Sequence, residues 1–411
     1  MFIMKKSIFK KTAAFAASVI MAAAAAVPAM TASADYAVDF KDSGKIIKEI
    51  LVTTEDTTAT TVAAPYIKYT YEITPATVAA DVKVTDKDNA TGPVTAGPTG
   101  GLTIADAAKD VDLKGEDVTV SAGAGKITKE IPITYDEAAF KADGAFVPGI
   151  YRYEITETTD AEKASVGVVE PADYAATRFI DVYVDADGIY GTVMFAANDS
   201  VTYEGTQKTL GYTDESNTTK GDTDPTKGLA DTYPLFNYTV EKKVENSMLP
   251  NPEFNFTVAV TGVAGQKFTA EGAEKTIAAD TKVEKTLKDG GIIELKNIPA
   301  NVQLAVSEAN PNQASYTVNA VDETAGALIT GGALEIGGTQ GFDAKQIATI
   351  ASGTATKALG AKTTFTNRQT QISPTGIVFM IAPFVIMLAA GAFLTVLFMK
   401  NRKKDAAESI I

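Results

Sequence analysis

A long apolar run near the end of the chain limits the possible topology more than any other feature of the sequence. It extends from Ile377 to Met399 without a charged residue, and the basic segment 400–404 follows it. A helix of this length crosses a bilayer core of roughly 30 Å, and basic residues directly after such a helix stay on the cytoplasmic side. The sequence therefore predicts a membrane-spanning helix over 377–399, with everything before it outside the cell.

The beginning of the chain has the features of an export signal. Four lysines precede an alanine-rich apolar stretch, and Ala32-Ser33-Ala34 supplies the small residues of a cleavage site. We expect cleavage after Ala34, so that residues 1–34 are a signal peptide and the mature chain begins at Asp35. An uncleaved anchor helix is the alternative, and the small-residue site argues against it.

The composition excludes several classes of function. The chain has no histidine and no cysteine, which removes histidine-dependent nucleophilic sites and the usual metal ligands. Its net charge of −14 repels phosphate backbones. We therefore expect no metal, no cofactor and no nucleic-acid partner. Disulfides are permitted in exported proteins, so a chain without cysteine must be held by its cores alone or by some other link.

The sequence between the two apolar ends has the residue composition and the alternating pattern of a β protein. Segments such as 66–73 and 254–260 alternate apolar and polar residues and are rich in Thr, Val, Tyr and Phe. Clusters of Gly, Pro, Asn and Asp separate these segments, which favours antiparallel sandwiches. The region is too long for a single core. We predict an all-β fold with two tandem Ig-like antiparallel β-sandwich domains, 35–237 and 238–370.

The segment Asp185-Ala186-Asp187-Gly188 has the acidic spacing that begins some calcium-binding loops. Such a loop places a bidentate glutamate at the position that Met194 occupies here. A tight hairpin turn between strands at 179–184 and 189–195 is the better interpretation.

Two lysines lie among apolar residues in strand-like segments. Lys48 has isoleucine, and Lys242 has valine, at both i±2 positions. Residues i and i±2 share one face of a strand, so each lysine is expected to point into the core. A buried lysine is costly unless it is neutralised or bonded. The alternative is a lysine whose amine reaches solvent at the end of its strand.

The two lysines belong to an internal repeat. After each lysine comes a strand-like segment that begins with Pro and ends with Glu, at Glu157 in the first unit and Glu308 in the second. Each unit also has an asparagine near its end, Asn237 after Phe236 and Asn367 in Phe365-Thr366-Asn367. The order Lys, Glu, Asn therefore occurs twice.

This order resembles the intramolecular isopeptide sites of Gram-positive major pilins of the FctA or T-antigen-like type, which are built from pilin isopeptide-linkage domains. The resemblance covers nearly the whole mature chain and is best in the second unit, in 238–244, 254–256, Glu308 and 365–367. It implies one bond from Lys48 to Asn237 beside Glu157, and another from Lys242 to Asn367 beside Glu308.

The chemistry that the resemblance implies is physically consistent with burial. Burial lowers the pKa of a lysine and raises the pKa of a carboxylic acid. A neutral amine can then attack the asparagine carbonyl carbon while the protonated glutamate polarises that carbonyl and carries protons as ammonia leaves. Each bond forms once, so the chain modifies itself and is not an enzyme for other substrates.

The segment just before the apolar run resembles the sorting motif of Gram-positive surface proteins. It reads Ile372-Ser373-Pro374-Thr375-Gly376, with Ile and Ser where the common motif has Leu and Pro. Together with the apolar run and the basic tail it makes 371–411 a cell-wall sorting signal. The resemblance implies that a sortase cleaves the bond between Thr375 and Gly376 and transfers the Thr375 carboxyl group to an amine. Sortase, other copies of the chain and cell-wall peptidoglycan are therefore the expected partners, with host surface ligands as further candidates.

These features together predict the backbone subunit of a covalently polymerised pilus, located at the surface of a Gram-positive cell. A monomeric wall-anchored adhesin is the alternative. A wall-anchored hydrolase with an Asp/Glu pair is a third reading, but no specific pair stands out. A pilus also needs an exposed lysine that accepts the next subunit, and the resemblance places it in the first unit before the closing asparagine. Lys208, Lys220 and Lys227 lie in that window.

Overall fold

The computed structural model of the chain describes residues 45–78, 83–85, 91–171, 177–195, 231–370 and 385–396. Several predictions fall outside these residues. The signal peptide at 1–34, the sorting motif Ile372 to Gly376 and the three candidate acceptor lysines Lys208, Lys220 and Lys227 are all outside the described part of the chain. They remain predictions.

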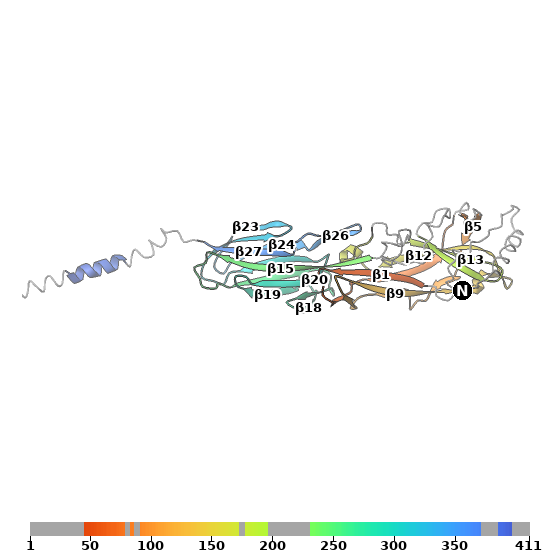
Figure 1. Ribbon diagram of the computed structural model, residues 1–411, viewed down its shortest axis with the longest axis horizontal. Helices are drawn as coiled ribbons and strands as arrows, with labels where there is room; N and C mark the ends of the chain where they lie inside the picture. The colour runs from red at the N-terminus through yellow and green to blue at the C-terminus, as the bar shows by residue number, and fades with distance from the viewer. Residues whose placement is uncertain are drawn as a thin grey trace, which may run out of the picture.

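The described part of the chain is mostly β, and Figure 1 shows two groups of strands that follow one another along the long axis of the molecule. The first group contains β1 (Lys45–Thr54), β2 (Thr60–Ala63), β3 (Lys68–Pro75), β4 (Lys83–Thr85), β5 (Thr91–Ala96), β6 (Leu102–Ile104), β7 (Asp110–Asp112), β8 (Asp117–Val120), β9 (Ala124–Tyr135), β10 (Lys141–Ala142), β11 (Ala145–Phe146), β12 (Gly149–Thr159), β13 (Thr177–Val184) and β14 (Ile189–Phe195), with the 3₁₀ turns η3 (Glu137–Phe140) and η4 (Lys163–Val166).

One long strand, β15 (Asp231–Glu245), connects the first group to the second. The second group continues with β16 (Phe254–Thr261), β17 (Lys267–Ala270), β18 (Ala273–Thr276), β19 (Lys282–Leu287), β20 (Ile292–Pro299), β21 (Gln303–Ala309), β22 (Tyr316–Asp322), β23 (Gly326–Leu334), β24 (Thr339–Gln346), β25 (Ala348–Ala351), β26 (Thr354–Lys357) and β27 (Lys362–Gln369).

The largest sheet among the described residues runs through both groups of strands. Its order is β18-β17-β20-β15-β1-β9-β6, and β27 also pairs with β15 and with β22. Each group has a further sheet across its core. In the first group this sheet has the order β14-β13-β12-β3-β7, and in the second it has the order β19-β16-β21-β24.

The strand β15 has parallel neighbours at both of its ends. Its first residues pair with β1, from Ile50 opposite Asp231 to Thr54 opposite Leu235. Its later residues pair with β27, up to Glu245 opposite Arg368. A parallel pair needs a long crossover connection, so each pair joins segments that are far apart in the sequence. The predicted antiparallel arrangement is therefore wrong at these two pairs and at the parallel pair of β12 with β5, although most other pairs are antiparallel.

The buried apolar side chains of the described residues form two large clusters. One contains side chains between Ile46 and Leu235, and the other contains side chains between Tyr238 and Phe365. The predicted domain boundary between residues 237 and 238 lies inside β15, and the two clusters divide on either side of it. Two independently folding domains remain a prediction.

The hairpin predicted around Asp185 is confirmed. β13 and β14 pair antiparallel, with Val184 opposite Ile189. The side chain of Asp185 closes the turn because its Oδ1 accepts hydrogen bonds from the backbone N–H groups of Asp187 and Gly188, at 2.8 and 2.9 Å. The aspartate therefore has a structural role in this turn.

The described residues contain no helix that is both long enough and apolar enough to cross a membrane. Of the segment 377–399, for which the sequence predicts a membrane-spanning helix, only 385–396 is described. These residues are helical and exposed. The rest of the predicted membrane-spanning helix lies outside the described residues.

Candidate functional site

The lysine of the second repeat unit, Lys242, lies in the core together with Glu308 and Asn367. All three side chains are fully buried. Lys242 Nζ is 2.8 Å from Glu308 Oε1, and Asn367 Nδ2 donates a hydrogen bond to the same oxygen at 2.7 Å. The structure thus brings together, from β15, β21 and β27, the three residues that the sequence predicts for the second site.

The pairing of the strands explains why these three side chains lie together. Asn367 on β27 lies opposite Val244 on β15, and Lys242 precedes Val244 by two positions. Residues two positions apart share a face of a strand, so the lysine and the asparagine point into the same core from neighbouring strands. Glu308 approaches from the sheet on the other side of that core, where it lies opposite Phe256.

The surroundings of Lys242 disfavour its charged form. Its Nζ atom lies 4.3 Å from the centre of the Phe254 ring and 6.0 Å from that of Phe256. Burial lowers the pKa of Lys242 to about 8 although the carboxylate of Glu308 acts in the opposite direction. Burial also raises the pKa of Glu308 above its ordinary value. Both shifts favour a neutral amine beside a neutral acid.

Two oxygen atoms of this site lack hydrogen bonds. Glu308 Oε2 and Asn367 Oδ1 are buried and have no hydrogen-bond partner among the described residues. A buried polar atom without a partner costs free energy, and such an exception in a folded protein needs an explanation. A proton on Glu308 Oε2 would provide a donor, and Asn367 Oδ1 is an acceptor that needs one. The site is therefore suited to an acid that polarises the asparagine carbonyl.

The depressed pKa of Lys242 leads to a prediction about pH. In an Asn367→Ala variant the amine stays free, so the folded state releases the Lys242 proton at a lower pH than the unfolded state does. Between pH 8 and the ordinary lysine pKa of 10.5, the unfolded state therefore binds more protons, and stability rises with pH. The free energy of unfolding of Asn367→Ala should therefore rise in this window, relative to that of Asn367→Ala/Lys242→Met, by up to about 1.4 kcal/mol per pH unit. Urea unfolding at several pH values measures the difference, and a flat difference would contradict the depressed pKa.

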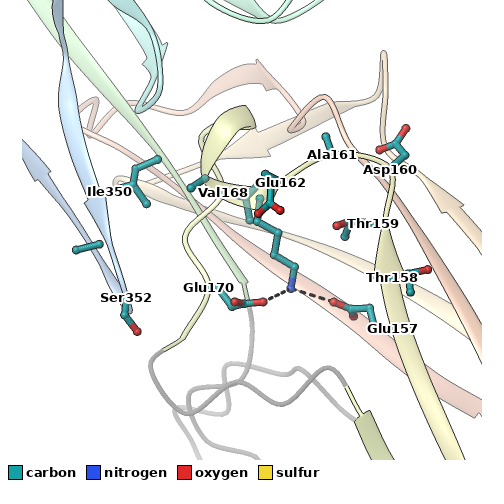
Figure 2. Close-up of a pocket in the computed structure, with 13 residues that line it drawn as sticks. Glu157, Thr158, Thr159, Asp160, Ala161, Glu162, Val168, Glu170, Ile350 and Ser352 are labelled. Atoms are coloured by element: carbon teal, nitrogen blue, oxygen red, sulfur yellow. Dashed lines mark hydrogen bonds and ion pairs between the residues drawn. The ribbon is translucent and has the colours of Figure 1, made fainter.

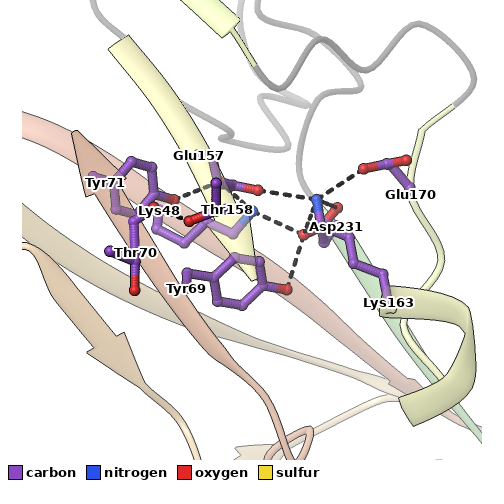
Figure 3. Close-up of polar contacts among 9 residues, drawn as sticks. All are labelled: Lys48, Tyr69, Thr70, Tyr71, Glu157, Thr158, Lys163, Glu170 and Asp231. Carbon is purple, nitrogen blue, oxygen red and sulfur yellow. Dashed lines mark hydrogen bonds and ion pairs between the residues drawn. The ribbon is translucent and has the colours of Figure 1, made fainter. Parts of the chain in front are cut away.

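The lysine of the first repeat unit, Lys48, lies in a larger polar cluster, shown in Figure 3. The Lys48 side chain is 1% exposed. Its Nζ atom is 2.8 Å from Asp231 Oδ2 and 3.2 Å from Glu157 Oε2. These residues come from β1, β15 and β12. The structure therefore brings the predicted Lys48 and Glu157 together, with an aspartate as the third member.

Asn237 does not belong to this cluster. Its Nδ2 donates to Asp56 Oδ1 at 3.2 Å, and its Oδ1 accepts from the backbone N–H of Asn297 at 3.1 Å. The prediction that Asn237 completes the first site is wrong because Asn237 lies further along β15, beyond the part of the strand that faces Lys48. Asp231, at the start of the same strand, occupies the position.

The two sites have the same strand register. In each, the third member lies on a parallel neighbour strand, opposite the residue two positions after the lysine. Asp231 is opposite Ile50 in the first site, and Asn367 is opposite Val244 in the second. Asp231 in the first site is thus equivalent in position to Asn367 in the second.

The aromatic residues of the two sites also correspond. The glutamate lies opposite Tyr71 in the first site and opposite Phe256 in the second. Two positions earlier, Tyr69 and Phe254 lie beneath the lysines, each with its ring centre 4.3 Å from the amine nitrogen. The first site therefore has tyrosines where the second has phenylalanines.

The tyrosine hydroxyls bind the two carboxylates of the first site. Tyr69 donates to Asp231 Oδ2 at 2.9 Å, and Tyr71 donates to Glu157 Oε2 at 2.5 Å. Burial, together with the nearby charge of Asp231, holds the pKa of Tyr69 well above its ordinary value. The Tyr69 hydroxyl therefore stays a neutral donor over the ordinary pH range.

A second lysine, Lys163, belongs to the first site. It lies in η4, and its Nζ atom is 3.0 Å from Glu157 Oε1, 3.1 Å from Asp231 Oδ2 and 3.0 Å from Glu170 Oε1. It also lines a cavity of about 590 Å³ whose other walls include Glu157, Glu170 and the 350–352 segment of the second group of strands (Figure 2). The sequence gives no signal for Lys163, because a short 3₁₀ turn leaves no periodic pattern.

One family model matches the part of the chain that contains the second site. Residues 237–369 match a domain of unknown function, DUF7601. No curated protein matches the chain.

Solved structures of pilus proteins are similar to the chain. The major pilin of Streptococcus pyogenes has 17% identity, covers 79% of this chain and 98% of its own, and has a TM-score of 0.39. The T-13 major pilin of the same species has 17% identity, 80% and 99% coverage, and a TM-score of 0.39. A pilus-presented adhesin, Cpa, has 12% identity, 48% and 38% coverage, and a TM-score of 0.24.

Proposed function

We propose that the chain is a structural subunit of a covalently polymerised cell-surface pilus, stiffened by amide bonds between its own side chains. The observation that carries the proposal is the buried group of Lys242, Glu308 and Asn367. It presents an amine of depressed pKa, an amide and an acid of raised pKa within hydrogen-bonding range of one another. Self-joining of this kind supplies the covalent link that an exported chain without cysteine otherwise lacks.

The reaction needs no group beyond these three side chains. The neutral Lys242 Nζ attacks Asn367 Cγ while protonated Glu308 donates a hydrogen bond to Asn367 Oδ1. The new bond joins Nζ to Cγ, the bond from Cγ to Nδ2 breaks, and Nδ2 leaves as ammonia with a proton relayed by Glu308 from Lys242. The site acts once on its own chain, so it has no turnover and no external substrate.

The assembly step rests on the sequence that follows β27. The last strand of the described residues ends at Gln369, and one residue separates it from the segment 371–376 that carries the sorting motif. Cleavage by sortase between Thr375 and Gly376 would place the transferable carboxyl group a few residues beyond the strand that holds Asn367. A link from Thr375 to a lysine of the next subunit, or to peptidoglycan, would then attach directly to the joined part of the chain.

Peptide mass spectrometry of the purified chain tests the joining reaction. After trypsin digestion, the peptide 363–368 should be recovered linked to the peptide that contains Lys242, and the pair should be lighter than its two components by one ammonia. Glu308→Ala should abolish this linked pair, because the acid that polarises the carbonyl is missing. Recovery of free 363–368 from the unaltered chain as the main species would overturn the proposal.

The covalent products found in the cell wall distinguish the proposed pilus subunit from the alternative function, a monomeric wall-anchored adhesin. Expressed in a cell with its sortase, a pilus subunit should give a ladder of covalent multimers in wall extracts, and a monomeric adhesin should give one anchored size. The triple variant Lys208→Arg/Lys220→Arg/Lys227→Arg should remove the ladder and leave the anchored monomer. Lys243→Arg is the matched control, because this lysine is 57% exposed in its side chain and lies outside the window. A normal ladder from the triple variant would show that another lysine accepts the subunit.

A further inference from the structure

The first site differs from the second by a set of replacements that compensate one another. An aspartate stands in the position of the asparagine, a second lysine contacts it, and two tyrosines replace two phenylalanines. We propose that Lys48 and Asp231 condense into an amide with loss of water, and that Lys163 remains an ammonium ion that balances the charge of Glu157. The inference deepens the proposed function, because it rests on the same self-joining chemistry and assigns different reactants to it.

Two amines are close to Asp231, and geometry selects Lys48 as the one that reacts. Lys48 Nζ is 2.8 Å from Asp231 Oδ2, and Lys163 Nζ is 3.1 Å from it. Lys48 holds the same register position and the same distance to an aromatic ring as Lys242 does in the second site. Lys163 instead lies in η4, and its Nζ atom is 5.6 Å from the centre of the Tyr69 ring.

The need to balance charge explains why a second lysine, Lys163, contacts Asp231. Asp231 adds a negative charge that the equivalent asparagine lacks, and an unbalanced buried charge is very costly. With Lys163 present, two lysines face Asp231 and Glu157. Joining of Lys48 to Asp231 removes one charge of each sign and leaves Lys163 and Glu157 as an ion pair at 3.0 Å. The site is therefore balanced before and after the bond forms.

The environment of Lys163 suits this role. Burial alone lowers its pKa, but the negative charges of Glu157 and Asp231 outweigh burial, and the pKa of Lys163 lies above its ordinary value. Its side chain is 11% exposed, and Glu170 also contacts it. Lys163 is thus held as an ammonium ion, whereas Lys242 in the second site is held closer to the neutral form.

The condensation balances without a further reactant. A proton passes from the Lys48 ammonium to the carboxylate, with Glu157 in position to relay it, and gives an amine and a carboxylic acid. Nζ then bonds to Asp231 Cγ, a Cγ–O bond breaks, and that oxygen leaves as water with two hydrogen atoms that Lys48 loses. Tyr69 donates a hydrogen bond to Asp231 Oδ2, so it stabilises the carboxyl oxygen without adding charge.

Trypsin digestion of the purified full chain provides a specific readout. If both bonds form, the peptide 228–243, which contains Asp231 and Lys242, should be linked to 46–68 through Lys48 and to 363–368 through Asn367. This three-peptide species should be lighter than its components by one water and one ammonia. Recovery of 363–368 linked to 228–243, but with 46–68 cleaved after Lys48, would overturn the inference and leave the proposed function intact.

Variants at Asp231 identify the acceptor. Asp231→Ala should remove the link to 46–68 and retain the link to 363–368. Asp231→Asn should give a linked species of the same mass as the unaltered chain, because loss of ammonia from asparagine and loss of water from aspartate leave the same amide. A link that persists in Asp231→Ala, or one that joins a peptide through Lys163 in place of Lys48, would overturn the assignment.

Variants at Lys163 test its positioning role by their pH dependence. In Lys163→Met, joining of Lys48 to Asp231 leaves the buried Glu157 carboxylate without either lysine ammonium, so the joined state is favoured when Glu157 takes up a proton. The joined fraction of the first site should fall at neutral pH and recover as the pH is lowered, while Lys163→Arg should join as the unaltered chain does. The Lys242–Asn367 link in the same digest is the internal control for folding. A joined fraction in Lys163→Met that equals that of the unaltered chain at every pH would overturn the role of Lys163.

Discussion

The Asn367→Ala variant is expected to lose about 4–5 kcal/mol of stability in the second group of strands, since this is the contribution of a cross-link that closes a loop on the order of 100 residues. The variant removes the acceptor of the Lys242 amine, so β15 and β27 are held by hydrogen bonds and packing alone. The ion pair of Lys242 with Glu308 remains, and no buried charge is left without its partner. Most of the loss should therefore come from the greater freedom of the unfolded chain.

Denaturant unfolding of the unaltered chain and the variant measures this loss. Asn255→Ala is the matched control, because Asn255 lies on β16 with an exposed hydrogen bond to Thr286, and its loss should cost no more than about 1 kcal/mol. Glu308→Ala should be at least as destabilised as Asn367→Ala, because it prevents the bond and also leaves Lys242 buried without its carboxylate. If Asn367→Ala were as stable as Asn255→Ala, the covalent bond would be absent from the unaltered chain.

The second site was predictable because its signals are local. The apolar residues at i±2 place Lys242 on the buried face of its strand, and the repeated order Lys, Glu, Asn singles out Glu308 and Asn367. The structure adds what no local pattern contains, namely the alignment of Lys242 with Asn367 across neighbouring strands. That register depends on how the sheet assembles, and only the repeated order of residue types pointed to it.

The first site was predictable only in part, for a physical reason. Lys48 and Glu157 have local signals like those of the second site, but the acceptor was sought as an asparagine. Asn237 matched that expectation in type and order, whereas Asp231 did not. A parallel neighbour separated from Lys48 by 183 residues in sequence is fixed by sheet assembly alone. The partners of Tyr69 and Tyr71 depend on the same long-range register.

Because both sites include a residue of β15, the two proposed bonds together determine how the chain carries tension. Asp231 and Lys242 lie on this one strand, and the two proposed bonds attach it to β1 through Lys48 and to β27 through Asn367. With both bonds in place, a covalent path runs from β1 through β15 to β27, and the chain from 49 to 230 and from 243 to 366 lies outside it. Tension applied at the ends would then bypass both cores.

A single-molecule pulling experiment should therefore show little lengthening of the unaltered chain when it is held at residues 45 and 370. Asp231→Ala opens the first bond, so unfolding should release the 183-residue span between Lys48 and position 231, a gain of about 600 Å at roughly 3.4 Å per residue. Asp231→Asn is the matched control, because it keeps the bond and should lengthen as little as the unaltered chain. Asp231→Ala/Asn367→Ala should add a second step from the span that Asn367 closes. Lengthening of the unaltered chain by the full first step would show that its first site is not joined, since a covalent bond at Asp231 cannot let that span extend.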